Sequence, residues 1–124
     1  MIHGIGIDIA EISRVWQAQE RNARFAQRVL TVNELAVFTK LTPKRQAEYL
    51  TGRFAVKEAY SKALGSGIGK QVGFLDLELL NKKNGAPYFA KYPQSETLKA
   101  HVSLSHSTDL VIAEVILEKN EEKM

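Results

Sequence analysis

One long helical segment constrains the fold of this chain more than any other feature of its sequence. Thr42 and Pro43 are typical of an N-cap and a first helical position, and the glycine-rich residues 65–69 are typical of a helix end. We therefore expect a helix over residues 43–64. Its small apolar side chains share one broad face: Ala55, Val56, Ala59, Tyr60 and Ala63. Such a face favours close packing against a β-sheet.

Apolar periodicity predicts that sheet from segments before and after the helix. Residues 2–7 form an apolar run too short for a helix, and it ends at Asp8. The period changes to two over residues 75–80, and Asn84-Gly85 then predicts a hairpin turn. Residues 101–105 and 110–117 predict the last strands, the second apolar on both faces like a central strand. The fold class is therefore α+β, with a mostly antiparallel sheet packed against the long helix.

Shorter helices are indicated by capping patterns. The spacing of Asp8 and Glu11 matches a capping box, and Thr31 and Glu34 match a second one. A further short helix is expected over residues 95–100. If the first helix continues to residue 28, five polar side chains fall within an arc of roughly 80°. They are Arg14, Gln17, Arg21, Arg24 and Arg28.

Composition limits the class of protein. A chain of 124 residues fits one domain, which we place at residues 1–118, with 119–124 as a frayed tail. The absence of cysteine excludes disulfides, thiolate metal sites and cysteine nucleophiles. No apolar run approaches the ~20 residues of a membrane span, and the N-terminus lacks a signal-peptide pattern. We expect a cytoplasmic protein without membrane contact, and a net charge of +3 is too small to indicate nucleic acid.

Two carboxylates, Asp8 and Glu58, carry the chemical interpretation. Asp8 ends the first predicted strand, and Glu58 lies among Arg53, Lys57 and Lys62 on the long helix. Mg²⁺ commonly takes one or two protein carboxylates and fills other positions with phosphate oxygens. The neighbouring cations and the glycine-rich loop would supply donors for the same phosphates. This pattern favours magnesium-dependent phosphate chemistry.

Each of these features also has a purely structural interpretation. Asp8 can be only a helix cap, Glu58 can be only the i,i+4 partner of Lys62, and His106 can be a structural histidine at a strand end. The basic face of the first helix can be merely solvated. The glycine-rich loop has neither P-loop nor dinucleotide-binding spacing. Neither a zinc site nor a serine nucleophile elbow is supported.

Taken together, four motifs closely resemble the holo-acyl-carrier-protein synthase family of 4'-phosphopantetheinyl transferases. They are GIGIDIAE at 4–11, FAQRVLTVNE at 25–34, GRFAVKEAYSKALGSGIG at 52–69 and VSLSH at 102–106. The resemblance extends from residue 1 to about 118. The departures are small: Val56 stands where alanine is usual, and Ser66 where threonine is usual. Neither removes a charge.

The resemblance implies transfer of 4'-phosphopantetheine from coenzyme A to a serine of apo acyl carrier protein in fatty acid biosynthesis. It implies Mg²⁺ held by Asp8 and Glu58, catalysis by these acids and Lys62, and a homotrimer with active sites between subunits. Coenzyme A would contact seven further positions: Lys44, Arg45, Arg53, Gly65, Gly67, Asn84 and His106. The acidic carrier protein would dock on the first helix, at Arg14, Arg21, Arg24 and Phe25.

In the expected reaction the carrier serine attacks the β-phosphorus of coenzyme A and releases adenosine 3',5'-bisphosphate. Lys62 would stabilise the charge of the leaving group, and the base would be a water held by the metal or by Glu58, with Glu34 as an indirect participant. Two other functions stay open. One is a non-catalytic basic module that binds acidic proteins or nucleic acid, and the other is a magnesium-dependent phosphohydrolase that splits coenzyme A in water.

Overall fold

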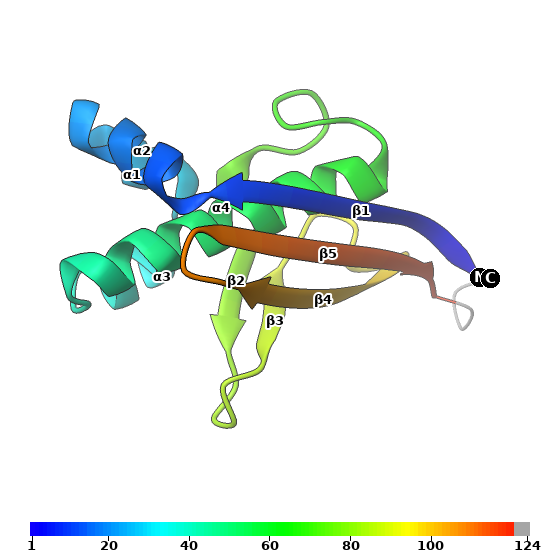
Figure 1. The fold of residues 1–124 in the computed structure, drawn as a ribbon. Coiled ribbons are helices and arrows are strands. Elements are labelled where there is room, and N and C mark those ends of the chain that lie inside the picture. The colour runs from blue at the N-terminus through cyan, green and yellow to red at the C-terminus, as the bar shows by residue number, and fades with distance from the viewer. Residues whose placement is uncertain (121–124) are drawn as a thin grey trace.

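The computed structural model describes residues 1–120, and its centre is a helix, α4, that lies across a three-stranded antiparallel sheet (Figure 1). The strand order is β1-β5-β4, so β5 is the central strand, as its apolar sequence predicted. The predicted α+β class and the predicted limits of the long helix are both confirmed. These elements span Ile2–Glu11 (β1), Pro43–Leu64 (α4), Leu98–His106 (β4) and Leu110–Lys119 (β5).

Strand β1 packs against α4 with backbone touching backbone. A Cβ atom added to Gly4 would lie 1.9 Å from the carbonyl oxygen of Ala63, and one added to Gly6 would lie 1.9 Å from that of Ala59. Only glycine, which has no Cβ, fits at such positions. Because side chains alternate along a strand, Asp8 follows the two glycines on the face toward the helix. The glycines therefore bring Asp8 close to α4.

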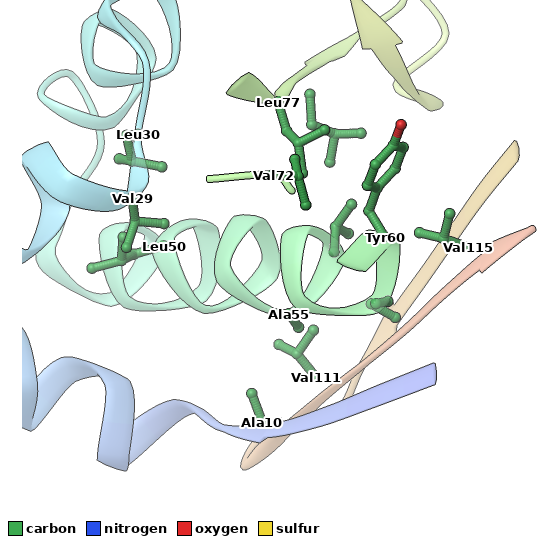
Figure 2. Packing of buried hydrophobic residues seen from close by; sticks show 14 of the residues in the cluster. Ala10, Val29, Leu30, Leu50, Ala55, Tyr60, Val72, Leu77, Val111 and Val115 are labelled. Carbon is green, nitrogen blue, oxygen red and sulfur yellow. The ribbon is translucent and has the colours of Figure 1, made fainter. Parts of the chain in front are cut away.

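A second layer covers the other side of α4. In Figure 2, Ala55 points from the helix toward Val111 on the sheet, whereas Val72 and Leu77 lie on the opposite side of the helix. All four belong to one core cluster, together with Tyr60 at the C-terminal half of the helix. The helix is thus buried on two sides, which explains why its apolar face is so broad.

The second layer is a two-stranded hairpin, β2 (Glu78–Asn81) and β3 (Pro87–Lys91). Its turn contains Gly85 at φ +91°, as the Asn-Gly pair predicted. The predicted strand start at residue 75 was wrong. Phe74–Asp76 instead form a single 3₁₀ turn, η1, in which the Asp76 carboxylate accepts a hydrogen bond from the N–H of Gly73.

Three short helices gather at the N-terminal end of α4, on the side of the molecule away from the chain termini (Figure 1). The predicted capping box opens the third of them, with Thr31 and Glu34 each accepting a hydrogen bond from the other's backbone N–H. The helices span Ile12–Arg21 (α1), Arg24–Val29 (α2) and Val32–Phe38 (α3).

The first helix does not continue to residue 28, because the chain is divided into α1 and α2 at Asn22. The side chain of Asn22 accepts a hydrogen bond from the N–H of Arg24, and Gln19 donates to the carbonyl oxygen of Ala23 and accepts from the N–H of Ala26. Polar side chains therefore satisfy the backbone groups that the break exposes. The predicted basic stripe is consequently spread over two helices.

Two further local predictions were wrong because strand pairing extends beyond the local signal. β1 continues past Asp8 to Glu11, so Asp8 lies within a strand and caps no helix. Residues 95–100 are not a helix: the carbonyl oxygen of Gln94 accepts hydrogen bonds from Thr97 and Leu98 in a turn, and β4 begins at Leu98.

The first two residues of the predicted tail at 119–124 are part of the folded structure. Lys119 ends β5, and the N–H of Asn120 donates to the carbonyl oxygen of Thr97 at 3.0 Å. Residues 121–124 lie outside the described part of the chain. Over residues 1–120, no helix combines the length and apolar character needed to cross a membrane.

The sheet face that points away from α4 carries exposed isoleucines. Ile9 of β1 pairs with Ile112 of β5, and both side chains lie on this outer face. Four such residues are about half exposed: Ile5 (58%), Ile7 (52%), Ile9 (61%) and Ile112 (46%). Large apolar side chains gathered on one face are typical of an interaction surface.

Candidate functional site

The two carboxylates singled out in the sequence line one cavity of about 550 Å³. Asp8 reaches it from β1, and Glu58 reaches it from α4. We call it the acid cavity, and its rim includes Arg14, Phe25 and Phe54. Fifty residues of sequence separate the acids, so the close packing of β1 on α4 is what brings them together.

Lys62 completes this group of charges. Its ammonium Nζ donates to Asp8 Oδ1 at 2.9 Å and to the carbonyl oxygen of Ile7 at 3.1 Å. The Lys62 side chain is 51% exposed, and that of Asp8 is 15% exposed. Burial raises the pKa of Glu58, the negative charge of Asp8 raises it further, and Lys62 lowers it in part. One lysine therefore offsets only part of the repulsion between two acids.

Lys57 does not join this group, although the sequence analysis placed it around Glu58. Its side chain is fully buried, and Nζ donates to Glu34 Oε1 and to the carbonyl oxygen of Val29, both at 2.6 Å. Glu34 also accepts hydrogen bonds from the N–H groups of Thr31 and Leu79. We call this the closed ion pair. It connects α4 with α3 and β2 and gives Glu34 no access to a substrate proton.

Arg53 likewise lies away from Glu58, in a second cavity of about 410 Å³ that we call the arginine cavity. Arg45, Gly85 and His106 line it as well, so three of the predicted coenzyme-binding side chains converge there. Two other predicted positions, Lys44 and Asn84, are exposed. They are the sequence neighbours of Arg45 and Gly85 but do not line the cavity themselves.

Gly65 and Gly67 form the turn that follows α4. Both have positive φ, +93° and +73°, and their N–H groups donate to the carbonyl oxygen of Ser61, Gly67 at a long 3.4 Å. The turn is exposed, and it begins three residues after Lys62. Its glycines are therefore explained by backbone conformation alone in this structure, and their predicted contact with coenzyme A stays a prediction.

The predicted carrier-docking residues fall on α1 and α2 beside the acid cavity. Arg14 and Phe25 line the cavity itself, whereas Arg21 and Arg24 are exposed farther along these helices. Phe25 is partly buried and its ring lies 6.0 Å from that of Phe54, centroid to centroid. The basic surface thus leads directly to the acids.

One aromatic residue of each cavity was not predicted from the sequence. Phe54 lines the acid cavity one helical turn before Glu58, and Tyr49 lines the arginine cavity one turn before Arg53. The i,i+4 spacing on a predicted helix was the available signal.

Comparison with known proteins decides the family. The sequence model of the 4'-phosphopantetheinyl transferase superfamily matches residues 4–115. The chain belongs to this superfamily. Holo-[acyl-carrier-protein] synthase of Ligilactobacillus salivarius is 54% identical over 120 residues, covering 96% of this chain and 89% of the relative. That of Streptococcus sanguinis is 54% identical over 122 residues, covering 98% and 99%. The resemblance inferred from the motifs is confirmed.

Solved structures of the superfamily share the fold of this transferase. A holo-(acyl-carrier-protein) synthase from Bacillus anthracis, in complex with CoA (3',5'-ADP), has a TM-score of 0.89 and 44% identity, covering 97% of this chain and 99% of the other. The Helicobacter pylori holo-[acyl-carrier-protein] synthase in complex with coenzyme A has a TM-score of 0.80 and 31% identity, covering 92% and 99%.

Proposed function

We propose that this chain transfers 4'-phosphopantetheine from coenzyme A to a serine of apo acyl carrier protein, in fatty acid biosynthesis. The observation that carries the proposal is the convergence of Asp8 and Glu58 on one cavity, with Lys62 bound to Asp8, in a member of this superfamily. Relatives about half identical over nearly the whole chain are holo-[acyl-carrier-protein] synthases, and two structural neighbours contain coenzyme A or its nucleotide portion. The predicted cytoplasmic location stays a prediction.

Mg²⁺ fits the donor set of the acid cavity. Residues 1–120 contain no cluster of three histidine, cysteine, aspartate or glutamate side chains able to hold a metal ion. The pKa of Glu58 is raised mainly by burial and further by repulsion from the carboxylate of Asp8. A cation bound between the two carboxylates would relieve this repulsion. Mg²⁺ needs only one or two protein carboxylates when waters and phosphate oxygens complete its shell. When bound there by Asp8 and Glu58, it would neutralise charge on the diphosphate.

Lys62 and Glu58 have separate roles in the proposed reaction. The serine oxygen forms a bond to the β-phosphorus as the bond from this phosphorus to the bridging oxygen breaks, and adenosine 3',5'-bisphosphate leaves. Lys62 stabilises the growing negative charge of that oxygen without transferring a proton. A water held by the metal or by Glu58 accepts the serine proton.

The arginine cavity is proposed for the phosphorylated nucleotide end of coenzyme A. Arg45, Arg53 and His106 offer donors for phosphate oxygens there. Arg53 and Glu58 are five residues apart on α4 and line different cavities, so they project from different sides of the helix. A coenzyme bound between two copies of the chain could contact the acid cavity of one and the arginine cavity of the other.

The proposed homotrimer accounts for this arrangement and for the outer face of the sheet. Ile5, Ile7, Ile9 and Ile112 would pack against the same surface of other copies. Light scattering after gel filtration should give the mass of three chains. The variant Ile7→Asp should reduce the mass and lower transferase activity together, and an active monomer would overturn the proposal.

The carrier protein is proposed to dock on α1 and α2. Arg14, Arg21 and Arg24 would contact its acidic side chains, and Phe25 lies where this surface meets the acid cavity. The serine could then enter the cavity past Arg14.

One assay distinguishes the transferase from the alternatives. The chain is incubated with apo carrier protein, coenzyme A and Mg²⁺, and the carrier protein is weighed by mass spectrometry. The proposal predicts a mass increase equal to one phosphopantetheine, at the serine and only with Mg²⁺. Binding without a covalent product would indicate the basic module, and cleavage of coenzyme A without a carrier would indicate the phosphohydrolase.

A further inference from the structure

Two buried polar atoms in the arginine cavity lack hydrogen-bond partners. They are the hydroxyl oxygen of Tyr49 and Nε of Arg53, which stand four residues apart on one side of α4. Both residues line the cavity, and Arg53 is only 5% exposed. Buried donors without partners are uncommon in proteins because each loses its bonds to water. Their presence together, at a cavity wall, points to a bound group.

The packing around Arg53 shows which of its donors remains available. One terminal nitrogen donates to the carbonyl oxygen of Leu79 at 3.1 Å and to Asn81 Oδ1 at 2.6 Å. The guanidinium lies over the ring of Tyr49, with 4.1 Å between Cζ and the ring centroid. These contacts fix the orientation of the guanidinium and leave Nε without an acceptor within residues 1–120.

The ring of Tyr49 is fixed as well. It packs against Phe38, with the ring centroids 6.4 Å apart, and against the guanidinium on its face. Burial raises the pKa of Tyr49, and the charge of Arg53 offsets part of this, so the hydroxyl keeps its proton at neutral pH. A protonated phenol is a donor, and Nε–H of arginine is a donor only.

An acceptor oxygen at this wall would satisfy both groups, and the charges favour an anionic one. Arg45 and Arg53 both line the cavity, against one acidic side chain, Glu48. His106 adds a ring nitrogen at the same wall. A phosphate group presents several acceptor oxygens to such a wall, and its contacts with arginine are strong.

We infer that Tyr49 is a specificity residue for the phosphorylated nucleotide end of coenzyme A, and that its hydroxyl donates a hydrogen bond to a phosphate oxygen beside Arg53 Nε. The inference rests on the proposed function, which places that end of the coenzyme in the arginine cavity. It adds that this chain distinguishes coenzyme A from dephospho-coenzyme A partly through one phenol.

The test is calorimetric titration of the full chain with coenzyme A, 3',5'-ADP and dephospho-coenzyme A. Tyr49→Phe removes the hydroxyl and keeps the ring that packs against Phe38 and Arg53. It should weaken binding of coenzyme A and 3',5'-ADP by roughly 3- to 10-fold, the effect of losing one hydrogen bond. Binding of dephospho-coenzyme A should not change. The matched control, Tyr88→Phe, alters an exposed tyrosine outside the cavity and should bind all three ligands as the parent chain does.

The other outcomes separate this inference from the proposed function. If Tyr49→Phe binds 3',5'-ADP as tightly as the parent chain, the hydroxyl contacts at most an ordered water and the inference is overturned. An equal loss for dephospho-coenzyme A would also overturn it, because the hydroxyl would then contact another part of the ligand. If the parent chain itself binds no coenzyme A, the proposed function fails, and the inference fails with it.

Discussion

Lys57 and Glu58 are neighbours on α4, yet they belong to two different kinds of charge cluster. Lys57 and Glu34 form the closed ion pair, which is fully buried and satisfied by backbone groups. Glu58 shares the acid cavity with Asp8, and Asp8 pairs with the half-exposed Lys62. The first cluster has no capacity for another ligand, whereas the second has two acids and one cation. Charges that are completely paired hold the fold together, and charges left incompletely paired can bind a ligand.

Removing Asp8 or Glu58 is the strongest test of the difference between the acid cavity and the closed ion pair. Asp8→Ala or Glu58→Ala should reduce phosphopantetheine transfer by roughly 10³-fold, or about 4 kcal/mol in activation free energy, because each removes a proposed metal ligand. Circular dichroism and thermal unfolding should show an intact fold. If both variants stay active with added Mg²⁺, metal binding by these carboxylates is refuted.

The closed ion pair should respond in the opposite way. Lys57→Met leaves the buried Glu34 carboxylate without its cation and should lower the free energy of unfolding by about 3 kcal/mol, measured by urea denaturation. Adding Glu34→Gln removes the unpaired charge but sets its NH2 group against the N–H of Thr31 or Leu79, so it should restore only part of this loss. The matched control is Lys62→Met, which should change stability by less than about 1 kcal/mol because the Lys62 side chain is half exposed. Equal losses in the two lysine variants would remove the distinction between the clusters.

The carrier protein must also reach the acid cavity. Arg14 is exposed beside the acid cavity, so Arg14→Glu should raise the KM for the carrier protein about 10-fold and leave that for coenzyme A unchanged. Added salt should reduce the difference. Lys91→Glu, at the exposed end of β3, is the control and should behave like the parent chain. A parallel loss for coenzyme A would mean that the docking surface lies elsewhere.

The smallest expected effect concerns stability and pH. Since folding raises the pKa of Glu58, the native state binds its proton more tightly than the unfolded state, and ionised Glu58 destabilises the fold above that pKa. Glu58→Gln without metal should therefore be more stable at about pH 7, by about 0.5 kcal/mol after allowance for solvent screening.

This gain should shrink as the pH falls through the raised pKa and vanish below 4.5, the usual value for glutamate, because the parent side chain is then neutral in both states. Urea denaturation across this pH range measures it, with the exposed Glu96→Gln as control. A gain that persists unchanged at low pH would assign the effect to packing instead of charge.

The sequence by itself determined the features that depend on neighbouring residues. Caps and turns act over a few positions, so the limits of α4, the capping box at Thr31 and the Gly85 turn were predicted correctly. The motifs also identified the family, because they record side chains in a fixed order.

Only the tertiary structure decided which charges meet. β1 runs to Glu11 because it pairs with β5, a hundred residues later in the chain, and no local signal reports that register. Gly4 and Gly6 allow β1 to pack closely on α4, which brings Asp8 near Glu58. Lys57 immediately precedes Glu58 on α4 but lies on a different side of the helix, where it pairs with Glu34 in the core. Contacts between distant segments depend on packing, and packing determines whether a carboxylate is buried and satisfied or exposed and able to react.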